Sequence, residues 1–291
     1  MSGVSSVVYS LRLKVKPTVL IDARNLTPDK FAGRELSDLK NIAVLEGGRR
    51  VQLSELFDVD GPEKAPLDPG QITIVFETGS DKLCFIGYRM SKGRIVVKGD
   101  AGHLVGYKMR GGSIVVEGSA RNYVGAKMRD GTIEVYGNVG HMLGGKLLGE
   151  KPGKGMKGGT IVVRGNAGSE VGVGMERGVI IIEGSAGNMV GSGMLGGSII
   201  VKKDCGLYPG AGMSGGRVII GDRVGAILPS FYVDSIVPSV SVRGIRFDKP
   251  FMLFMGDAAT GGRGLLYISF EDNRELLSYY KSLIEEEGAE V

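Results

Sequence analysis

Short apolar segments recur through the middle of the chain at a fixed spacing. A methionine heads each segment, and successive methionines lie 19, 19, 28, 19, 19 and 19 residues apart. Each lies in the pattern Gly-x-x-Met-x-x-Gly, which is followed by a run rich in isoleucine and valine. The seven positions are Met90, Met109, Met128, Met156, Met175, Met194 and Met213. A register kept over this many copies indicates an internal structural repeat.

Apolar side chains alternate within each copy. The alternating pairs are Ile95/Val97, Ile114/Val116, Ile133/Val135, Ile161/Val163, Ile180/Ile182, Ile199/Val201 and Val218/Ile220. A period of two predicts a strand. The segments between strands carry turn residues without a helical pattern. Because one strand per repeat cannot bury itself, we expect a fold dominated by β-structure, a right-handed parallel β-helix of about seven 19-residue coils. Alternating two-stranded blades are the main rival.

Stacking of such coils predicts columns of equivalent side chains. The methionines and the alternating Ile/Val pairs should fill the interior. A charged column should pair Lys98 with Glu117 on the next strand, and Glu183 with its neighbours Arg164 and Lys202. Opposite charges on neighbouring strands stabilise a sheet by about 0.2 to 1 kcal/mol per pair. The one spacing of 28 residues places a protruding loop at residues 144–156.

The residue between each inward pair should point away from the core. Six of these seven positions are apolar, the exception being Glu134: Val96, Val115, Val162, Ile181, Ile200 and Ile219. A strand face open to water normally carries polar residues, and an apolar stripe along the whole rod would be unusually large for a monomer. The N-terminal cap, the C-terminal helix or a partner chain could cover these six side chains. Because we expect neither flank to be long enough to cover all seven coils, we predict that these side chains form a partner interface.

The repeat divides the chain into three parts. Residues 1–81 lack it and predict a small α+β cap, with a strand in VVYSLRLKV, short helical turns in DKFAGRELSDLKN and a hairpin across Gly47 and Gly48. Residues 82–228 form the glycine-rich β-helix. Residues 229–291 predict a C-terminal extension, with a strand at 265–270 and an amphipathic helix whose apolar face carries Leu276, Tyr280, Leu283 and Ile284.

Composition narrows the classes of partner and location. The chain has 50 glycines without a three-residue period, which excludes collagen. Its net charge of +4 comes from 36 basic and 32 acidic residues mixed along the chain, so we expect no nucleic-acid partner. No apolar stretch is long enough to cross a membrane. With two cysteines and no apparent signal peptide, the sequence predicts a cytoplasmic protein with reduced thiols.

No motif in the chain predicts a catalytic, cofactor or metal site. The loop LGEKPGKGM lacks the spacing of a phosphate-binding loop. His103 and His141 lie two coils apart, roughly 9.6 Å by strand spacing, which is too far for one ion and favours a hydrogen-bonded polar ladder. Cys84 and Cys205 are expected to be inert packing residues. The repeated column beginning at Asp100 is interpreted as turn residues that bond to their own backbone.

The glycine-rich repeat resembles the β-helix of two known families. These are the C-terminal domain of the glutamate synthase large subunit and the C subunit of formylmethanofuran dehydrogenase. The flanks separate the two, because PDKFAGRELSDLKNIAVLEGGRRVQLSELFDVDG (28–61) and FMGDAATGGRGLLY (254–267) are similar to segments beside the repeat in the dehydrogenase family. The resemblance then extends over some 240 residues, and the helix after Phe270 departs from the family pattern.

This resemblance implies a non-catalytic scaffold subunit of an oxidoreductase complex. The family's complex reduces CO2 at a molybdenum or tungsten pterin centre and transfers the formyl group to methanofuran at a binuclear metal centre, or runs in reverse. Those cofactors are expected in partner subunits and none in this chain. The alternatives are a stand-alone glutamate synthase β-helix domain, the C subunit of a formyltransferase/hydrolase complex, and a carbohydrate-active β-helix enzyme.

Overall fold

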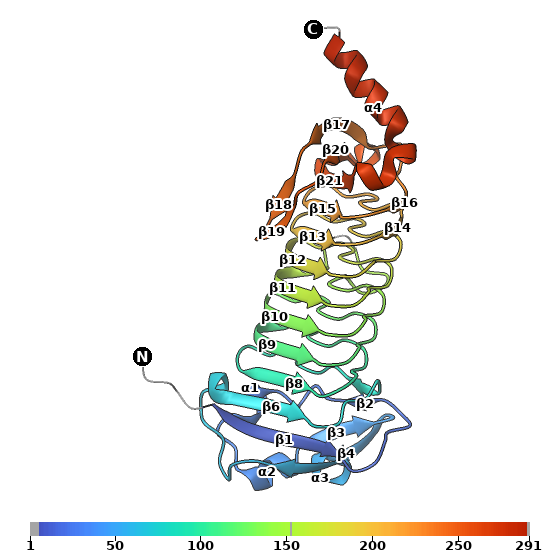
Figure 1. The fold of residues 1–291 in the computed structure, drawn as a ribbon. Coiled ribbons are helices and arrows are strands. Elements are labelled where there is room, and N and C mark those ends of the chain that lie inside the picture. Colours follow the sequence, from blue (N-terminus) through green and yellow to red (C-terminus); the bar gives the residue numbers. More distant parts are fainter. Residues whose placement is uncertain (1–5, 152, 290–291) are drawn as a thin grey trace, which may run out of the picture.

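A single long sheet dominates the protein, whose structure, a computed structural model, describes residues 6–151 and 153–289. Figure 1 shows its strands stacked along a rod, with the N-terminal elements at one end and α4 at the other. In sheet order the strands are β5 (Phe57–Asp60), β1 (Val7–Leu13), β6 (Ile72–Phe76), β8 (Arg94–Val97), β9 (Arg110–Val116), β10 (Asp130–Val135), β11 (Lys157–Val163), β12 (Arg177–Ile182), β13 (Ser198–Val201), β15 (Arg217–Ile220), β21 (Gly264–Ser269), β20 (Phe251–Gly256) and β17 (Tyr232–Val237). All neighbours from β1 to β21 are parallel, which agrees with the expected β-helix.

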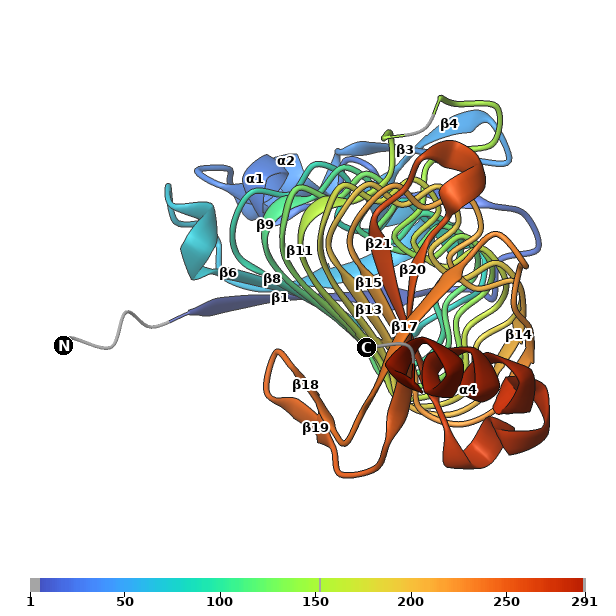
Figure 2. The ribbon, with the colours of Figure 1, turned by 90° about the horizontal axis from the view of Figure 1, so that it is seen from above.

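The strand register follows the repeat. Ile95 pairs with Ile114, Ile114 with Ile133, and Ile133 with Ile161 across the 28-residue spacing. A second series of parallel bridges joins one residue per repeat on another side of the stack, from Ala101 through Ala120 to Cys205. Because each repeat meets the next at two separate places, the whole backbone turn is stacked and not only its strand. The view along the rod in Figure 2 shows these turns superimposed.

The methionine column interlocks with the second glycine of the repeat motif. All seven methionines have no exposed surface. A Cβ atom on Gly112 would lie 2.4 Å from Met90 Cε of the previous coil, and Gly112 has a φ of +79°. The same contact joins Gly131 to Met109, Gly159 to Met128, Gly178 to Met156, Gly197 to Met175 and Gly216 to Met194. The spacing between methionine and glycine is therefore a packing requirement between coils, since only glycine leaves room for the methyl group.

The N-terminal part continues the sheet and adds a smaller one. Strand β1 pairs in parallel with β6 and antiparallel with β5. The smaller sheet has the order β4 (Arg49–Gln52), β3 (Ala43–Glu46), β2 (Ile21–Asp22) and β7 (Leu83–Cys84). The helices of this part are α1 (Pro28–Phe31), α2 (Leu36–Lys40), α3 (Leu53–Leu56) and the 3-10 turn η1 (Pro69–Gln71). The predicted strand, helical turns and hairpin across Gly47 and Gly48 are all confirmed.

The C-terminal part closes the other end of the sheet. Strand β21 adds to β15, and β20 and β17 follow it in antiparallel order. The remaining elements are β14 (Cys205–Leu207), β16 (Val224–Ala226), the hairpin of β18 (Val240–Val242) and β19 (Ile245–Phe247), the 3-10 turns η2 (Ala258–Thr260) and η3 (Glu271–Asn273), and α4 (Arg274–Ala289). None of the helices among the described residues has the length and apolar character needed to span a membrane.

The helix α4 packs through a different face from the one predicted. Leu277 is fully buried, and Tyr280 and Ile284 pack against the main core, whereas Leu276 is 37% exposed. The Tyr280 ring meets the Phe254 ring edge-on at 5.1 Å. The expected face was wrong by one residue at Leu276, because the turn η3 sets where the helix starts and the sequence pattern alone did not place that start.

Candidate functional site

The hairpin β18–β19 covers one part of the column of outward-facing apolar residues that was predicted to form an interface, and leaves the other part open. Ile200 and Ile219 have no exposed surface and form a separate cluster with Val240, Val242 and Phe251. Ile181 is partly buried against the same cluster. Figure 2 shows the hairpin lying outside the stacked coils. For Ile200 and Ile219 the expectation of a partner-facing surface is therefore corrected, since a segment of the same chain covers them.

The other half of the column has no such cover. Val96, Val115 and Val162 are only half-buried on β8, β9 and β11. Between them, the Glu134 carboxylate accepts hydrogen bonds from the Arg164 guanidinium at 2.6 and 3.0 Å. These three valines remain a predicted partner surface, bounded on one side by the N-terminal part and on the other by the hairpin.

Two columns of polar turn residues join successive coils. The backbone N–H of Ser119 donates to Asp100 Oδ1 at 2.8 Å, and that of Asn166 donates to Asn138 Oδ1 at 2.8 Å. The acceptor side chain and the donor lie one repeat apart, so the expectation that these side chains bond to their own backbone was wrong. Because the same geometry recurs along the stack, these residues link coils and form no unique catalytic constellation.

The two histidines belong to the second polar column. The backbone N–H of His141 donates to Asn122 Oδ1, and His141 Nδ1 in turn accepts the backbone N–H of Ser169, both at 3.0 Å. The predicted polar ladder is confirmed from Asn122 to Asn188, whereas for His103 the bond is from its backbone N–H to Cys84 Sγ at 3.4 Å. In the part of the chain that the structure describes, no group of three or more His, Cys, Asp or Glu side chains is placed to hold a metal ion.

Both cysteines are buried thiols. Burial raises the pKa of Cys205 to about 12, and burial likewise raises the pKa of Cys84. The thiolate is the reactive form of cysteine, so both side chains are poor nucleophiles at neutral pH. Their predicted role as packing residues agrees with this chemistry.

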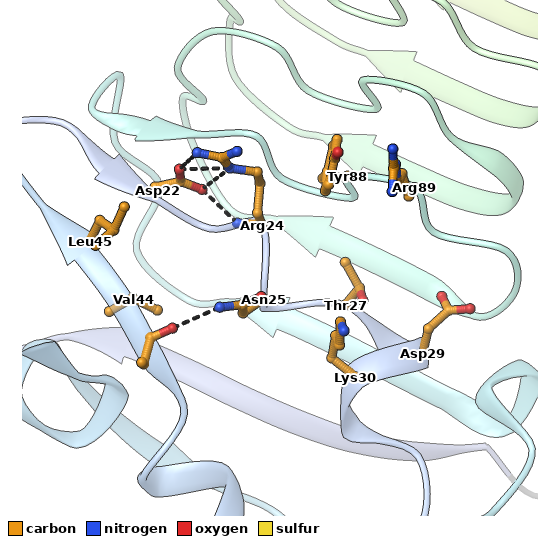
Figure 3. A pocket seen from close by; sticks show the side chains of 11 residues that line it. Asp22, Arg24, Asn25, Thr27, Asp29, Lys30, Val44, Leu45, Tyr88 and Arg89 are labelled. Carbon is orange, nitrogen blue, oxygen red and sulfur yellow. Dashed lines mark hydrogen bonds and ion pairs between the residues drawn. The ribbon is translucent and has the colours of Figure 1, made fainter. Parts of the chain in front are cut away.

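A polar pocket lies where the N-terminal part meets the first coils. Its cavity of about 380 Å³ is lined by residues from β2, the following segment, α1, β3 and the turn before Met90. Figure 3 shows Asp22 and Arg24 at one side of this pocket, with Lys30 and Asp29 at the other. The sequence offered no signal for it, because its residues come from segments that no shared motif connects.

Three charged groups of this pocket, Asp22, Arg24 and Asp29, have polar partners. The Arg24 guanidinium donates to the Asp22 carboxylate at 2.5 to 3.0 Å and lies 4.6 Å above the Phe85 ring. The Asp29 carboxylate accepts a hydrogen bond from the backbone N–H of Ser91 at 3.0 Å. The Asp29–Ser91 hydrogen bond and the contact of Arg24 with the Phe85 ring tie the N-terminal part to the coils. We therefore assign the pocket a structural role in that junction.

A second, apolar cavity of about 540 Å³ lies beside the first. It is lined by Leu20, Leu45, Phe85, Leu104 and Tyr123, with Cys84 and His103 among the other walls. Leu20 is 51% exposed and Leu45 is 39% exposed. Such a mainly apolar surface suits an apolar side chain of a partner, and Asp22, His103 and Tyr123 are the polar side chains among its walls.

The segment 254–267, one of the two flanks that carried the family resemblance, ends the stack through Asp257. Its carboxylate accepts the backbone N–H groups of Gly212 and Ala259, each at 3.0 Å. A Cβ atom on Gly262 would lie 2.1 Å from the Met213 carbonyl oxygen, so glycine is required there. The segment thus packs against Met213, the last methionine of the repeat.

Replacing Asp257 by asparagine should destabilise the protein by about 1 kcal/mol at pH 7, because charge-assisted hydrogen bonds are stronger than neutral ones. Burial raises the pKa of this carboxyl, but hydrogen bonds from a serine hydroxyl and two backbone N–H groups outweigh burial and hold the pKa below its ordinary value. The stabilisation is therefore present above the unfolded pKa and is lost as the pH falls through the lower folded value.

Urea unfolding of both proteins between pH 7 and pH 3 measures this effect. The difference in stability between wild type and Asp257→Asn should shrink as the pH falls below about 4. A difference that stays constant over this range would show that the charge of Asp257 contributes nothing.

Comparison with known proteins places the chain in a family. The model of the family described as GXGXG motif matches residues 72–239. The C subunit of tungsten-containing formylmethanofuran dehydrogenase 2 from Methanothermobacter wolfeii is 36% identical over 93 residues, which are 32% of this chain and 33% of that protein. The C subunit of molybdenum-containing formylmethanofuran dehydrogenase 1 from Methanosarcina barkeri is 34% identical over 84 residues, 29% of this chain and 27% of that protein. The match thus spans about a third of the length of these curated relatives.

One solved structure resembles nearly the whole chain. It belongs to the formyltransferase/hydrolase complex from Methylorubrum extorquens in complex with methylofuran. The likeness has a TM-score of 0.77 at 29% identity and covers 89% of this chain and 99% of that one. Because the family model covers more than half of the sequence, the chain belongs to the GXGXG motif family, and its similarity to the C subunits of formylmethanofuran dehydrogenases confirms the resemblance that its sequence carries.

Proposed function

We propose that this chain is a non-catalytic scaffold subunit of a formylmethanofuran dehydrogenase complex. The carrying observation is the likeness, over 89% of this chain, to one chain of a formyltransferase/hydrolase complex, which extends beyond the repeat. The sequence relatives, which are C subunits of formylmethanofuran dehydrogenases, favour the dehydrogenase. The scaffold is a right-handed β-helix of about seven 19-residue coils at residues 82–228, between the cap at 1–81 and the extension at 229–291.

The contacts of the candidate site residues support a structural role for this chain. The histidine column and the column that begins at Asp100 bond to the backbone of the next coil, and both thiols are buried. Each feature that could have carried chemistry contributes instead to the stacking of coils. By this proposal the molybdenum or tungsten pterin and the binuclear metal centre lie in partner subunits, in a cytoplasmic complex that reduces CO2 to the formyl level or runs in reverse.

A second candidate is the C subunit of a formyltransferase/hydrolase complex. It is favoured by the solved structure, whose match covers far more of this chain than the curated dehydrogenase subunits do. The same scaffold would then hold formyl-transferring and hydrolytic chains without a redox centre. A stand-alone glutamate synthase β-helix is the third alternative, which would be found beside flavin-containing chains.

Purification of the native chain from its source tests all three. We expect it to co-purify with several other chains, in a complex that contains molybdenum or tungsten and oxidises formylmethanofuran. Formyl transfer in a complex without either metal would support the second candidate. Recovery of the chain alone, or with glutaminase and flavoprotein chains, would contradict the proposal.

The half-covered valines give a prediction about assembly. Substituting lysine for Val96, Val115 and Val162 together should weaken association with the partner subunits at least about tenfold, because charges would replace apolar surface at the interface. The isolated variant should remain folded, since all three side chains reach solvent. Leu67→Lys, at a side chain that is 85% exposed and outside the column, serves as the control. Normal assembly of the triple variant would place the interface elsewhere.

A further inference from the structure

Seven basic side chains surround one cavity on the side of the rod. They are Arg89, Lys108, Arg110, Lys127, Arg129, Lys154 and Lys157, and the cavity that they line measures about 270 Å³. We call this group the basic basin. No acidic residue is among its lining residues. Its neighbour is the polar pocket of Figure 3, which shares Arg89.

The repeat itself builds the basin. Arg89, Lys108 and Lys127 each precede a methionine of the interior column, while Arg110 and Arg129 each follow one. Residues in such columns lie on neighbouring coils roughly 4.8 Å apart, so the basin, from the coil of Met90 to that of Met156, spans about 14 Å along the rod. Lys154 comes from the loop that interrupts the 19-residue spacing. Lys157 follows Met156 on a fourth coil, so the charges are arranged in rows across four coils and are held by the most regular part of the fold.

Few carboxylates neutralise this charge. Lys127 pairs with Glu150, and Lys157 pairs with Glu176 at 2.8 Å. Within residues 6–151 and 153–289 the other five basin side chains make no ion pair, although Arg89 and Lys108 lie 5.2 and 5.0 Å from tyrosine rings. Elsewhere on the same coils charges are paired, as where Arg164 bridges Glu134 and Glu183. Like charges on adjacent strands repel, so the basin is unfavourable unless something anionic binds there.

The backbone under the basin is left-handed at the position before the methionine. The residue before the methionine has a left-handed φ of 54° at Arg89, 58° at Lys108 and 56° at Lys127. In the last three coils the same position is glycine, with φ between 58° and 68°. This conformation is unfavourable for a residue with a Cβ atom and free for glycine. Three successive coils thus accept strain where glycine would remove it, and each places a cation in the basin.

The groups available in the basin indicate which anion would fit. The backbone N–H of Lys108 donates to the Ala126 carbonyl at 3.0 Å, and that of Arg110 to the Met90 carbonyl at 2.8 Å. The Arg129 N–H is used in the same way. Compact phosphate sites are usually built on free backbone N–H groups, which these positions lack. Long basic side chains spread over about 14 Å suit carboxylates that are spaced along an extended chain.

We propose that the basic basin is a docking site for an acidic segment of a partner polypeptide, with several Asp or Glu side chains along an extended backbone. The identity of the partner rests on the proposed function, because a scaffold subunit must hold other chains. The binding of acidic peptide does not rest on it. The two proposals can therefore fail separately.

The test uses the purified full-length chain and a fluorescein-labelled peptide of four Asp-Ser repeats. Alternate residues of an extended peptide share a face and lie roughly 6.6 Å apart, so two or three neighbouring carboxylates can meet the basin at once. A peptide of four Asn-Ser repeats is the uncharged control. The variant with Lys108→Gln, Arg110→Gln and Arg129→Gln removes three unpaired cations. Its matched control carries Lys40→Gln, Lys203→Gln and Arg217→Gln at exposed positions outside the basin, so both variants change the net charge equally. Circular dichroism confirms that each is folded.

Fluorescence anisotropy at low and high salt gives the result. We expect the acidic peptide to bind at least about tenfold more weakly to the basin variant than to wild type, with less than about twofold loss in the control variant and affinity that falls as salt rises. An equal loss in both variants would show attraction to net charge alone and overturn the proposal. Inorganic pyrophosphate is added at the concentration that supplies as many negative charges as the peptide. If it displaces the peptide, the basin is a compact phosphate site and the proposal is overturned. Failure of this assay while the native chain still co-purifies with partners would refute the basin and leave the proposed function standing.

Discussion

Deleting Val115 should unfold most of the rod. This residue lies in β9, which pairs with β8 on one side and β10 on the other. Loss of one residue exchanges the two faces of the strand beyond the deletion, because side chains alternate with a period of two. Glu117 would then take the inward position of Val116, which has no exposed surface. A carboxylate without a partner in this interior, together with lost packing, should destabilise the fold by about 5 kcal/mol or more.

The loop between Gly144 and Met156 supplies the matched control. Leu148 lies in this loop and is 81% exposed. Its deletion also shortens the chain by one residue, but the paired strands keep their register, so the change in stability should be within about 0.5 kcal/mol. Thermal unfolding followed by circular dichroism compares the two deletions with wild type. Equal melting of all three would contradict a structural register.

The sequence predicted the parts of the fold that repeat. A column along the stack repeats one local choice seven times, so the interior Ile and Val pairs and the methionines could each be identified from spacing alone, and all are buried. The pattern also predicted the hydrogen-bonded ladder in the histidine column, where His141 Nδ1 accepts a backbone N–H from the next coil. In such a fold each contact is local to neighbouring coils, which is why a single sequence sufficed.

Features that occur once were harder to predict. The charge column was only partly correct, because Lys98 pairs with Glu77 at 2.7 Å on the strand before the repeat and not with Glu117. The pocket around Arg24 joins segments whose proximity depends on how the N-terminal part packs. The hairpin β18–β19 did leave a signal, VSVRGIRF, in which two alternating runs flank Arg-Gly. Arg243 and Gly244 have φ values of 54° and 80°, as a two-residue hairpin turn of this type requires.

Lysine at position 200 should be far more damaging than lysine at position 96, although the two side chains belong to one column. Ile200 has no exposed surface and packs with Val240, Val242 and Phe251 under the hairpin. An ammonium group without a partner in this cluster should destabilise the protein by about 3 to 5 kcal/mol. Val96 is half-buried without the hairpin above it, so the lysine in Val96→Lys can extend its ammonium group into water, and we expect less than about 1 kcal/mol.

The hairpin of the Ile200→Lys variant can stay closed over the buried ammonium group or open and expose it to water. Urea unfolding and trypsin digestion distinguish these two results. If the hairpin stays closed, the midpoint of urea unfolding falls while trypsin resistance in water is kept. If the hairpin opens, Arg243 and Arg246 on it become early cleavage sites, because the exposed turn loses its support from Phe251 and its neighbours. Both results require that the hairpin covers Ile200 and Ile219. A variant that unfolds and resists trypsin as wild type does would return Ile200 and Ile219 to the partner surface first predicted for them.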